Sequence, residues 1–401
     1  MYNPFNSNIH EAERYTNGDW FFKLFGSNGS DKRIMSEKER LEAVMCNPAA
    51  LKVFKLQCDM FSLGDIKAIR NEKPQPNDKI LKFLKSPNPY QTHRQYLWDY
   101  MFWNMLGTAY LYSSSKIIKD STVQYFLDPS RFVWTEELLH KLDTNILSKK
   151  AFSDLEKLTI QYYNLDGSYT KYQLSEITPF FDLSNGLGNW YRGSSAIDAL
   201  YKVICNSGAS VTAKGINLEF SGKYFITGQH KEGDIYGTPM ATDEKDNIEK
   251  SVRSGKPVHA IKSMVDLKRF VENIDKLKLD EAYFSDYFKI ASMYGIPKDV
   301  AEAYAQGSTY ENQEKSKAAW IEQSLAPKGE DLMDGLQKIF GYQESNIDLV
   351  ISWNHLSFMQ VFERDRAAVK ATQLANLNMA KEMGILSEAD VLSRGKEIFE
   401  L

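Results

Sequence analysis

The sequence has few cysteines, no excess of positive charge and no long apolar run, and each shortage excludes a class of protein. Its three cysteines, Cys46, Cys58 and Cys205, lack zinc-like spacing and indicate reduced thiols in a cytosolic chain. The formal net charge of −4 argues against tight, sequence-independent clamping of nucleic acid, which needs a basic surface. No apolar run approaches the roughly 18 residues of a membrane-spanning helix, and the first twenty residues lack a signal-peptide pattern.

The motifs of common enzymes are also missing. The six histidines never fall at ligand spacing, and Glu136–His140 holds only half of a zinc-protease helix. The sequence contains neither a Gly-x-x-x-x-Gly-Lys-Ser/Thr loop nor a Gly-x-Ser-x-Gly elbow. Gly186, Gly188 and Gly193 precede a predicted helix, but their spacing differs from that of a dinucleotide-binding loop. We therefore expect no enzyme, no metal site and no cofactor.

Local patterns predict a mixed α+β chain of 401 residues, long enough for two or more modules. Ser36 and Glu39 fit a capping box at the start of a helix. An aromatic helix is expected from about Thr92 to Tyr110, and core packing explains its aromatic row better than base stacking does. Asp166-Gly167 lies between two alternating segments and predicts a β-hairpin over about 160–172.

The second half of the chain contains longer helical patterns. We expect one helix from 194 to about 214 and, after an irregular Gly-rich region over 215–260, a second from Leu267 to Met293. A polar loop over 303–310 then separates that helix from another over 311–340, which we expect to be broken at Ala326-Pro327. A strand over 347–353 and a final helix over about 362–383 complete the prediction. Long helices holding a loop between them suggest a structural part rather than a pocket.

Four segments within this pattern occur in a specific order and spacing. They are Asn88-Pro89-Tyr90 with the helix that ends at Leu106–Tyr112, then Tyr191–Leu200, then Tyr287–Pro297, and finally Tyr310–Glu314 leading to Trp320 and Leu325-Ala326-Pro327. Together, over roughly residues 88–395, the chain resembles the portal (head–tail connector) proteins of tailed bacteriophages. Two positions depart from the family pattern, because Ala196 and Lys298 stand where proline is common.

The resemblance implies a portal-like α+β fold with long stem and wing helices, a small mixed α/β clip and β-hairpin wing elements. It divides the chain into an N-terminal arm and wing (1–193), a first stem helix (194–214), a clip (215–262), a second stem helix (263–297), a channel loop (298–311), a long wing helix with a strand (312–361) and a short crown (362–401).

The resemblance also implies a structural, non-enzymatic function. Such proteins form a homo-oligomeric ring, typically of twelve subunits, at one capsid vertex, and double-stranded DNA passes through the ring during packaging and ejection. Implied partners are the terminase large subunit, a head-completion or adaptor protein, and the major capsid protein or a scaffold, without a membrane. The implied location is the virion, after assembly in the host cytoplasm.

Two sets of residues are the candidate functional sites. Five basic and five acidic residues lie between Lys262 and Glu281, and such a balanced helix could pair with identical neighbours around a ring. The candidate ring contacts are Lys268, Arg269, Glu272, Asp275 and Lys276. In the implied channel loop, Gln306, Gly307, Ser308 and Thr309 are expected to face the duplex without gripping its phosphates, because each neutralised phosphate adds affinity.

Two other classes of function are compatible with the residues alone. One is an intracellular enzyme with a site in the Gly-rich 186–260 region, and the other is a non-viral scaffold or adaptor. An enzyme predicts a small oligomer with a deep pocket and converging titratable groups, whereas a portal protein predicts a large ring.

Overall fold

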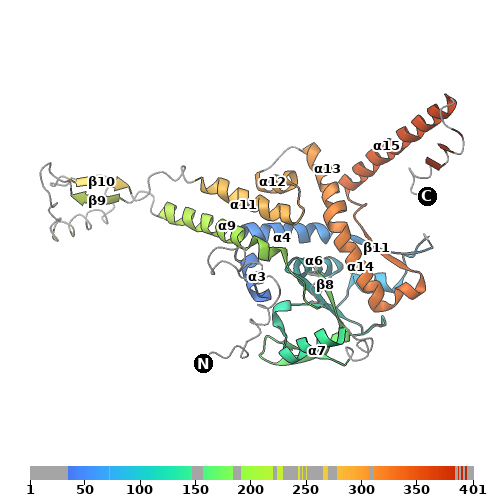
Figure 1. The fold of residues 1–401 in the computed structure, drawn as a ribbon, viewed down its shortest axis with the longest axis horizontal. Coiled ribbons are helices and arrows are strands. Elements are labelled where there is room, and N and C mark those ends of the chain that lie inside the picture. The colour runs from blue at the N-terminus through green and yellow to red at the C-terminus, as the bar shows by residue number, and fades with distance from the viewer. Residues whose placement is uncertain are drawn as a thin grey trace. The chain divides into compact units, whose positions relative to one another are not determined.

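The computed structural model of the chain describes residues 35–71, 73–146, 157–183, 191–219, 224–228, 265–269, 278–306 and 310–383, with single positions at 243, 246, 250, 387, 390, 391, 393 and 394. The chain divides into two compact units (Figure 1). The first unit combines residues up to Ile204 with residues from Tyr287 onward, and the second unit comprises Cys205–Asp286.

Four capped helices lie in the N-terminal half of the first unit. Helix α3 (Glu37–Met45) begins with the predicted capping box, in which the Glu39 N–H donates to Ser36 Oγ and the Ser36 N–H donates to Glu39 Oε2. Helix α4 (Pro48–Phe61) starts with a proline after the cap residue Asn47. Helix α6 (His93–Met105) is capped by Thr92, and the short helix α5 (Lys79–Lys85) precedes it.

The aromatic row of α6 packs in the core, as the sequence predicts. Tyr96, Tyr100 and Met101 are buried, and the ring centroids of Tyr100 and Phe61 of α4 lie 5.4 Å apart. The helix ends at Met105 rather than near Tyr110, because Gly107 adopts a φ of +126° that no helix contains. The chain then enters strand β3, so the part of the predicted helix over 108–110 is wrong.

Three small antiparallel sheets lie in the first unit. Strand β3 (Thr108–Ser113) is the centre of the order β4-β3-β8, with β4 at Gln124–Leu127 and β8 at Ile177–Phe181. The predicted hairpin is confirmed in the order β5-β6-β7, with β5 at Phe132–Val133, β6 at Thr159–Tyr163 and β7 at Tyr169–Gln173. Its turn contains Gly167 at φ +84°, and the Ser168 N–H donates to Asp166 Oδ1. Helix α7 (Glu136–Ile146) packs Leu138 and Leu142 on this hairpin.

The third sheet joins distant parts of the sequence. Its order is β11-β1-β2, with β1 at Asp65–Arg70, β2 at Lys73–Pro74 and β11 at Asp348–Ser352. Ile66 pairs with Ile351, and both side chains are buried. The predicted strand over 347–353 is thus confirmed. Short 3-10 turns occupy Pro129–Arg131, Leu174–Glu176 and Tyr342–Ser345.

The predicted helix over 311–340 is continuous rather than broken. Helix α13 (Tyr310–Trp320) passes into a π-helical turn, η5 (Ile321–Leu325), and then into α14 (Ala326–Phe340). The Ala326 N–H donates to the Ile321 carbonyl, five residues back, and this wider turn lies directly before Pro327, which has no N–H of its own. The final helix, α15 (Ser357–Glu382), is confirmed and begins five residues earlier than predicted.

Two further predictions of secondary structure are wrong. Residues 265–269, expected to begin a helix at Leu267, form strand β10 (Val265–Arg269), which pairs antiparallel with β9 (Tyr224–Gly228). The apolar residues Val265 and Leu267 alternate, and the aromatic partner strand favours pairing over a helical turn. Residues 298–306, expected to be loop, form helix α12 (Lys298–Gln306), whose Val300 and Ala301 are buried. Two further helices are α9 (Ala196–Glu219) and α11 (Leu279–Met293).

None of the helices in the described ranges is both long and apolar enough to cross a membrane.

Candidate functional site at the start of helix α9

The two sets of residues predicted as functional sites are not brought together by the described parts of the chain. Lys268 and Arg269 lie on strand β10 instead of a stem helix, and Glu272, Asp275 and Lys276 lie outside the described residues. Gln306 is the last residue of α12, while Gly307, Ser308 and Thr309 also lie outside the described residues. The channel set and the ring residues Glu272, Asp275 and Lys276 therefore stay predictions, whereas Lys268 and Arg269 do not lie on a stem helix.

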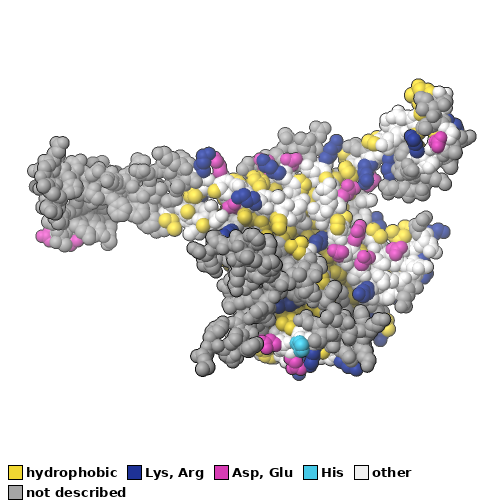
Figure 2. Space-filling view, in the orientation of Figure 1, with side chains coloured by type: hydrophobic (Ala, Val, Ile, Leu, Met, Phe, Trp, Pro, Cys, Tyr) yellow, Lys and Arg dark blue, Asp and Glu magenta, His cyan; other side chains and the backbone are white. Residues whose placement is uncertain are grey.

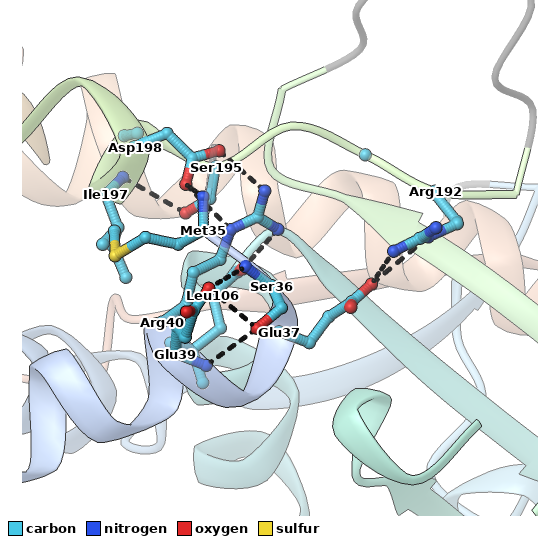
Figure 3. A network of polar contacts seen from close by, with 12 residues as sticks. Met35, Ser36, Glu37, Glu39, Arg40, Leu106, Arg192, Ser195, Ile197 and Asp198 are labelled. Atoms are coloured by element: carbon cyan, nitrogen blue, oxygen red, sulfur yellow. Dashed lines mark hydrogen bonds and ion pairs between the residues drawn. The ribbon is translucent and has the colours of Figure 1, made fainter. Parts of the chain in front are cut away.

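A different site is well described: the polar junction where α3 meets the first turn of α9 (Figure 3). Arg40 of α3 donates to both carboxylate oxygens of Asp198 in α9, with Nε–Oδ1 at 3.0 Å and Nη2–Oδ2 at 2.6 Å. The side chains are only 8% and 19% exposed, so this two-pronged ion pair is shielded from water. Arg40 Nη1 also donates to the Leu106 carbonyl just after α6, at 3.4 Å. One side chain thus links three helices.

A second ion pair lies beside the first. Arg192 Nη2 donates to Glu37 Oε1 at 2.8 Å, and the Arg192 guanidinium carbon lies 5.6 Å from the centre of the Trp134 ring. Burial alone would raise the pKa of Glu37, but the positive charges of Arg192 and Arg40 outweigh it, so that this pKa lies below its usual value. Glu37 is therefore ionised at neutral pH.

The first turn of α9 is held by two further groups. Asp182, just after β8, accepts from the Ala196 N–H at 3.2 Å and so caps the helix. Ser195 Oγ donates to the Met105 carbonyl at 2.9 Å and accepts from the Ile197 N–H at 3.2 Å. These bonds satisfy backbone donors that a helix start would otherwise leave unpaired.

Asp182 also connects the junction to α14. Lys328 Nζ lies 3.4 Å from Asp182 Oδ1 and donates to the Asp182 carbonyl at 2.9 Å, while the Tyr100 hydroxyl donates to the Lys328 carbonyl at 2.7 Å. Burial raises the pKa of Asp182 above its usual value, and the nearby Lys328 charge only partly opposes this effect. The start of α9 is thus tied to α3, α6, β8 and α14.

Two glycines allow the segment before α9 to lie close to the end of α6. The Gly193 N–H donates to Thr108 Oγ1 at 2.8 Å, and a Cβ at Gly193 would lie 2.6 Å from the Gly107 carbonyl oxygen. A Cβ at Gly107 would lie 2.8 Å from Arg40 Nη1, at a φ of +126°. A side chain at Gly193 would push the two backbones apart, and one at Gly107 would strain its own backbone and displace the Arg40 guanidinium.

The junction is suited to positioning rather than to chemistry. Arg40, Arg192 and Lys328 each have a carboxylate partner, so the charges within it are neutralised by one another. Among the residues that the structure describes, no group of three or more His, Cys, Asp or Glu could hold a metal ion. We therefore interpret the junction as the fixed base from which α9 extends.

Sequence reasoning found the segment of this junction but not its role. Tyr191–Leu200 was one of the four segments that resemble portal proteins, and it contains Arg192, Ser195 and Asp198. Glu37, the partner of Arg192, is 155 positions away, and Arg40, the partner of Asp198, is 158 positions away. The only local signal was the capping box at Ser36, which predicts where α3 begins but not what it contacts.

Comparisons with known proteins show which fold this is. No protein-family model matches the sequence, and a search of curated proteins finds no match. Among solved structures, a chain from the neck of the native gene transfer agent (GTA) particle, computed with C12 symmetry, has a TM-score of 0.57 at 14% identity; the match covers 93% of this chain and 97% of that chain. A chain from the neck of the empty GTA particle, computed with C6 symmetry, has a TM-score of 0.59 at 13% identity and covers 95% and 97%.

A phage portal protein also matches. It is the crystal structure of an HK97-family portal protein from Corynebacterium diphtheriae, with a TM-score of 0.49 at 12% identity, covering 80% of this chain and 95% of that one. The fold assignment rests on the GTA neck chains, whose TM-scores exceed 0.5. The predicted recognition is confirmed at the level of the fold: the chain shares the fold of the GTA neck chains, with mixed helices and small antiparallel sheets.

Proposed function

We propose that this chain is a structural head–tail connector, or portal, protein that forms a homo-oligomeric ring. The observation that carries the proposal is the likeness to the GTA neck chains over nearly the whole of both chains. Those chains belong to assemblies computed with twelve-fold and six-fold symmetry. A fold shared over this length is compatible with the same kind of ring, in which one surface of each copy meets a different surface of the next.

The surface of α9 supports a ring. Tyr201, Val211, Ile216 and Leu218 are exposed apolar side chains of this helix, and no charged residue lies between Lys202 and Lys214. Figure 2 shows yellow side chains along it. A solvent-facing helix normally carries charges on its outer face, and contiguous apolar patches commonly mark interaction sites. A neighbouring copy would cover this face.

The finer parts of the function follow from the resemblance and remain part of the proposal. The ring would stand at a capsid vertex of the virion and conduct double-stranded DNA during packaging and ejection, after assembly in the host cytoplasm. Its partners would be the terminase large subunit, a head-completion or adaptor protein, and the major capsid protein or a scaffold. Residues 306–309 would face the DNA.

The proposed parts of the chain need one adjustment. Helix α9 fits the first stem helix, but β10 pairs with β9, which lies in the region assigned to the clip. We therefore extend the proposed clip to include Val265–Arg269 and begin the second stem helix with α11 at Leu279. Lys268 and Arg269 become clip residues under this assignment, so that their role as stem contacts is no longer proposed.

Electron microscopy in negative stain, together with mass measurement of the purified chain, tests the proposal. We expect rings of about twelve copies, as the resemblance and the twelve-fold neck assembly suggest. The variant Val211→Glu/Ile216→Glu should abolish rings while keeping the helical circular dichroism signal. Leu165→Glu is the matched control, because Leu165 is 87% exposed and lies on the β6–β7 turn, a different element from α9. A wild-type chain that stays monomeric at high concentration would contradict the proposal.

The alternative of an enzyme with a site in residues 186–260 has no observation in its favour among the described residues of that region, which are 191–219, 224–228 and the single positions 243, 246 and 250.

A further inference from the structure

The segment from Lys67 to Lys85 has a strong local excess of positive charge. It contains six basic residues and two acidic ones, in a chain whose formal net charge is −4. The six basic side chains are exposed, and among the described residues none of them has a carboxylate partner: Lys67, Arg70, Lys73, Lys79, Lys82 and Lys85. Arg70 donates only to the neutral Ser345 carbonyl, at 3.1 Å.

The acidic residue Asp78 is already engaged by its own chain. Its Oδ1 accepts from the Ile80 N–H at 2.9 Å and so caps helix α5. The Tyr342 hydroxyl donates to the same oxygen. These two bonds hold the carboxylate at the start of α5 rather than beside Lys82 or Lys85.

Three of the lysines form a stripe on the outer side of α5. Lys79, Lys82 and Lys85 are spaced by three residues, so they lie within about 120° of the helix circumference. The buried side chains of Ile80 and Leu84 lie on the opposite side of the helix. The stripe is about 9 Å long, because each residue rises about 1.5 Å along the axis.

Two features of this segment are unfavourable for folding. The helix dipole favours Lys82 and Lys85 in the last turn of α5 but disfavours Lys79 in the first turn. Arg70 pairs directly with Lys73 across β1 and β2, and like charges opposite each other in an antiparallel pair are destabilising. Positive charges that cost stability, without a carboxylate partner, indicate a negatively charged partner outside the chain.

The two groups of charges lie on neighbouring elements. Helix α5 packs against β1, and between β2 and α5 the Gln75 N–H donates to the Ala68 carbonyl of β1 at 2.7 Å. The stripe on α5 and the pair on the β1–β2 turn therefore belong to one part of the fold.

We propose that the outer side of α5 and the β1–β2 turn form a phosphate-binding surface for double-stranded DNA. A duplex carries one phosphate per strand for about every 3.4 Å of its axis, so a stripe of about 9 Å matches two or three successive phosphates. Lysine binds phosphate as a flexible point charge, which suits a contact that does not read the bases. This inference rests on the proposed function, which brings DNA to the protein, and adds a contact by charge to the steric contact proposed for residues 306–309.

Binding of a short fluorescent duplex of random sequence to the purified full chain tests the surface, with anisotropy measured over a range of salt concentrations. The variant Lys79→Gln/Lys82→Gln/Lys85→Gln should bind at least about tenfold more weakly, and the slope of log affinity against log salt should fall by about two to three, because fewer counterions are released. Glutamine is a good helix former, so the thermal midpoint should stay unchanged. Arginine at the same three positions should restore binding, because it keeps the charge.

Lys119→Gln/Lys171→Gln/Lys250→Gln is the matched control, because it removes the same charge from exposed lysines outside this segment. It should keep the affinity within about twofold of wild type, since salt screens charges that do not contact the duplex. Equal losses in the two triple variants, or wild-type affinity in the α5 variant, would overturn the proposal. Polyglutamate bound as tightly as the duplex would assign the surface to an acidic protein instead and overturn the DNA contact.

Electron microscopy of the same samples separates this inference from the proposed function. Rings whose DNA binding does not change in the α5 variant would remove the phosphate-binding surface and leave the proposed function intact. A wild-type chain without rings, whose DNA binding still depends on α5, would contradict the proposed function and leave the surface.

Discussion

Arg40 and Asp198 show how single residues position the proposed stem helix. A shielded ion pair contributes little net stability compared with a well-packed apolar pair, because both charges lose their hydration. Removing one partner is costly, however, since the remaining charge is left buried without compensation. The main effect of the pair is therefore to fix the position of the start of α9, and its net contribution to the free energy of unfolding is small.

Arg40→Met should lower the free energy of unfolding of the first unit by about 3 kcal/mol, because Asp198 would remain shielded and unpaired. The double variant Arg40→Met/Asp198→Leu should lose clearly less than the sum of the two single variants. Denaturant titration followed by tryptophan fluorescence measures all four chains. Additive losses would show that the two side chains do not interact.

Gly193→Ala should destabilise the first unit by about 2 kcal/mol, because the added methyl group would lie 2.6 Å from the Gly107 carbonyl and a backbone atom cannot easily move. Gly215→Ala is the control, since nothing other than the adjacent backbone of its own helix lies within 4 Å of the position its Cβ would take. The control should leave the unfolding of the first unit unchanged. Thermal unfolding of both variants checks this contrast, and equal effects would contradict it.

Glu37 gives the junction a defined pH dependence. Its pKa is lower in the folded than in the unfolded chain, so its stabilising effect is present above the unfolded-state value and disappears as the pH falls through the folded-state value. Glu37→Gln should therefore be less stable than wild type at neutral pH, with the difference shrinking as the solution is acidified. Denaturant titrations at several pH values measure the difference, and a constant gap would refute the assignment.

At the scale of elements, the sequence predicts those parts whose local signals agree with their packing. The β6–β7 hairpin has an Asp-Gly turn between alternating strands, and α6 has an aromatic row long enough to fill a core. Strand β10 was not predicted because a segment of five residues is compatible with both the helical and the strand periodicity. The strand that pairs with it, Tyr224–Gly228, lies far away in sequence. Helix α12 was not predicted because its buried residues Val300 and Ala301 are flanked by polar residues in the sequence, so that the segment resembles a loop.

The folding of the first unit depends more on strand β11 than on helix α15. Strand β11 pairs with β1, and the following Trp353 is buried, with its indole N–H donating to the Met60 carbonyl at 3.2 Å. Most of α15 has exposed side chains, and its ion pair with Glu322 is exposed as well. Exposed ion pairs contribute little.

A chain that ends after Gln360 should therefore stay folded, with a thermal midpoint within about 3 °C of wild type in dilute solution, where copies are separate. A chain that ends after Asn346 should lose its cooperative transition, because β11 and Trp353 are removed from the core. Calorimetry compares the two truncations. A cooperative transition in the shorter chain would show that β11 is dispensable.

At the scale of the whole molecule, the portal-like fold was predictable because four motifs in the right order and spacing are specific together. The candidate ring and channel residues were not settled by that order, since residues 270–277 and 307–309 lie outside the described chain. Which surfaces of one copy face its neighbours depends on how the copies are arranged, and the sequence periodicity of a single copy does not specify that arrangement.

Deleting residues 305–309 should reduce DNA packaging or genome retention while leaving ring assembly intact, because the proposed loop touches DNA sterically and not by charge. DNA content of purified particles and electron microscopy of the rings measure the two effects. As a control, a Gly-Ser segment of equal length should restore packaging, since length rather than side-chain identity matters for steric contact. Unchanged packaging in the deletion variant would contradict the assignment of the loop.

The pairing of β1 with β11 has a consequence for biosynthesis. Asp65 leaves the ribosome long before its partner Ser352. The surface of α4 that contacts Trp320 and Trp353 in the folded chain has no such cover while residues 205–286 are being translated. Nascent chains of this protein therefore pass through a long aggregation-prone interval, in which chaperones of the translating cell would find their binding surface.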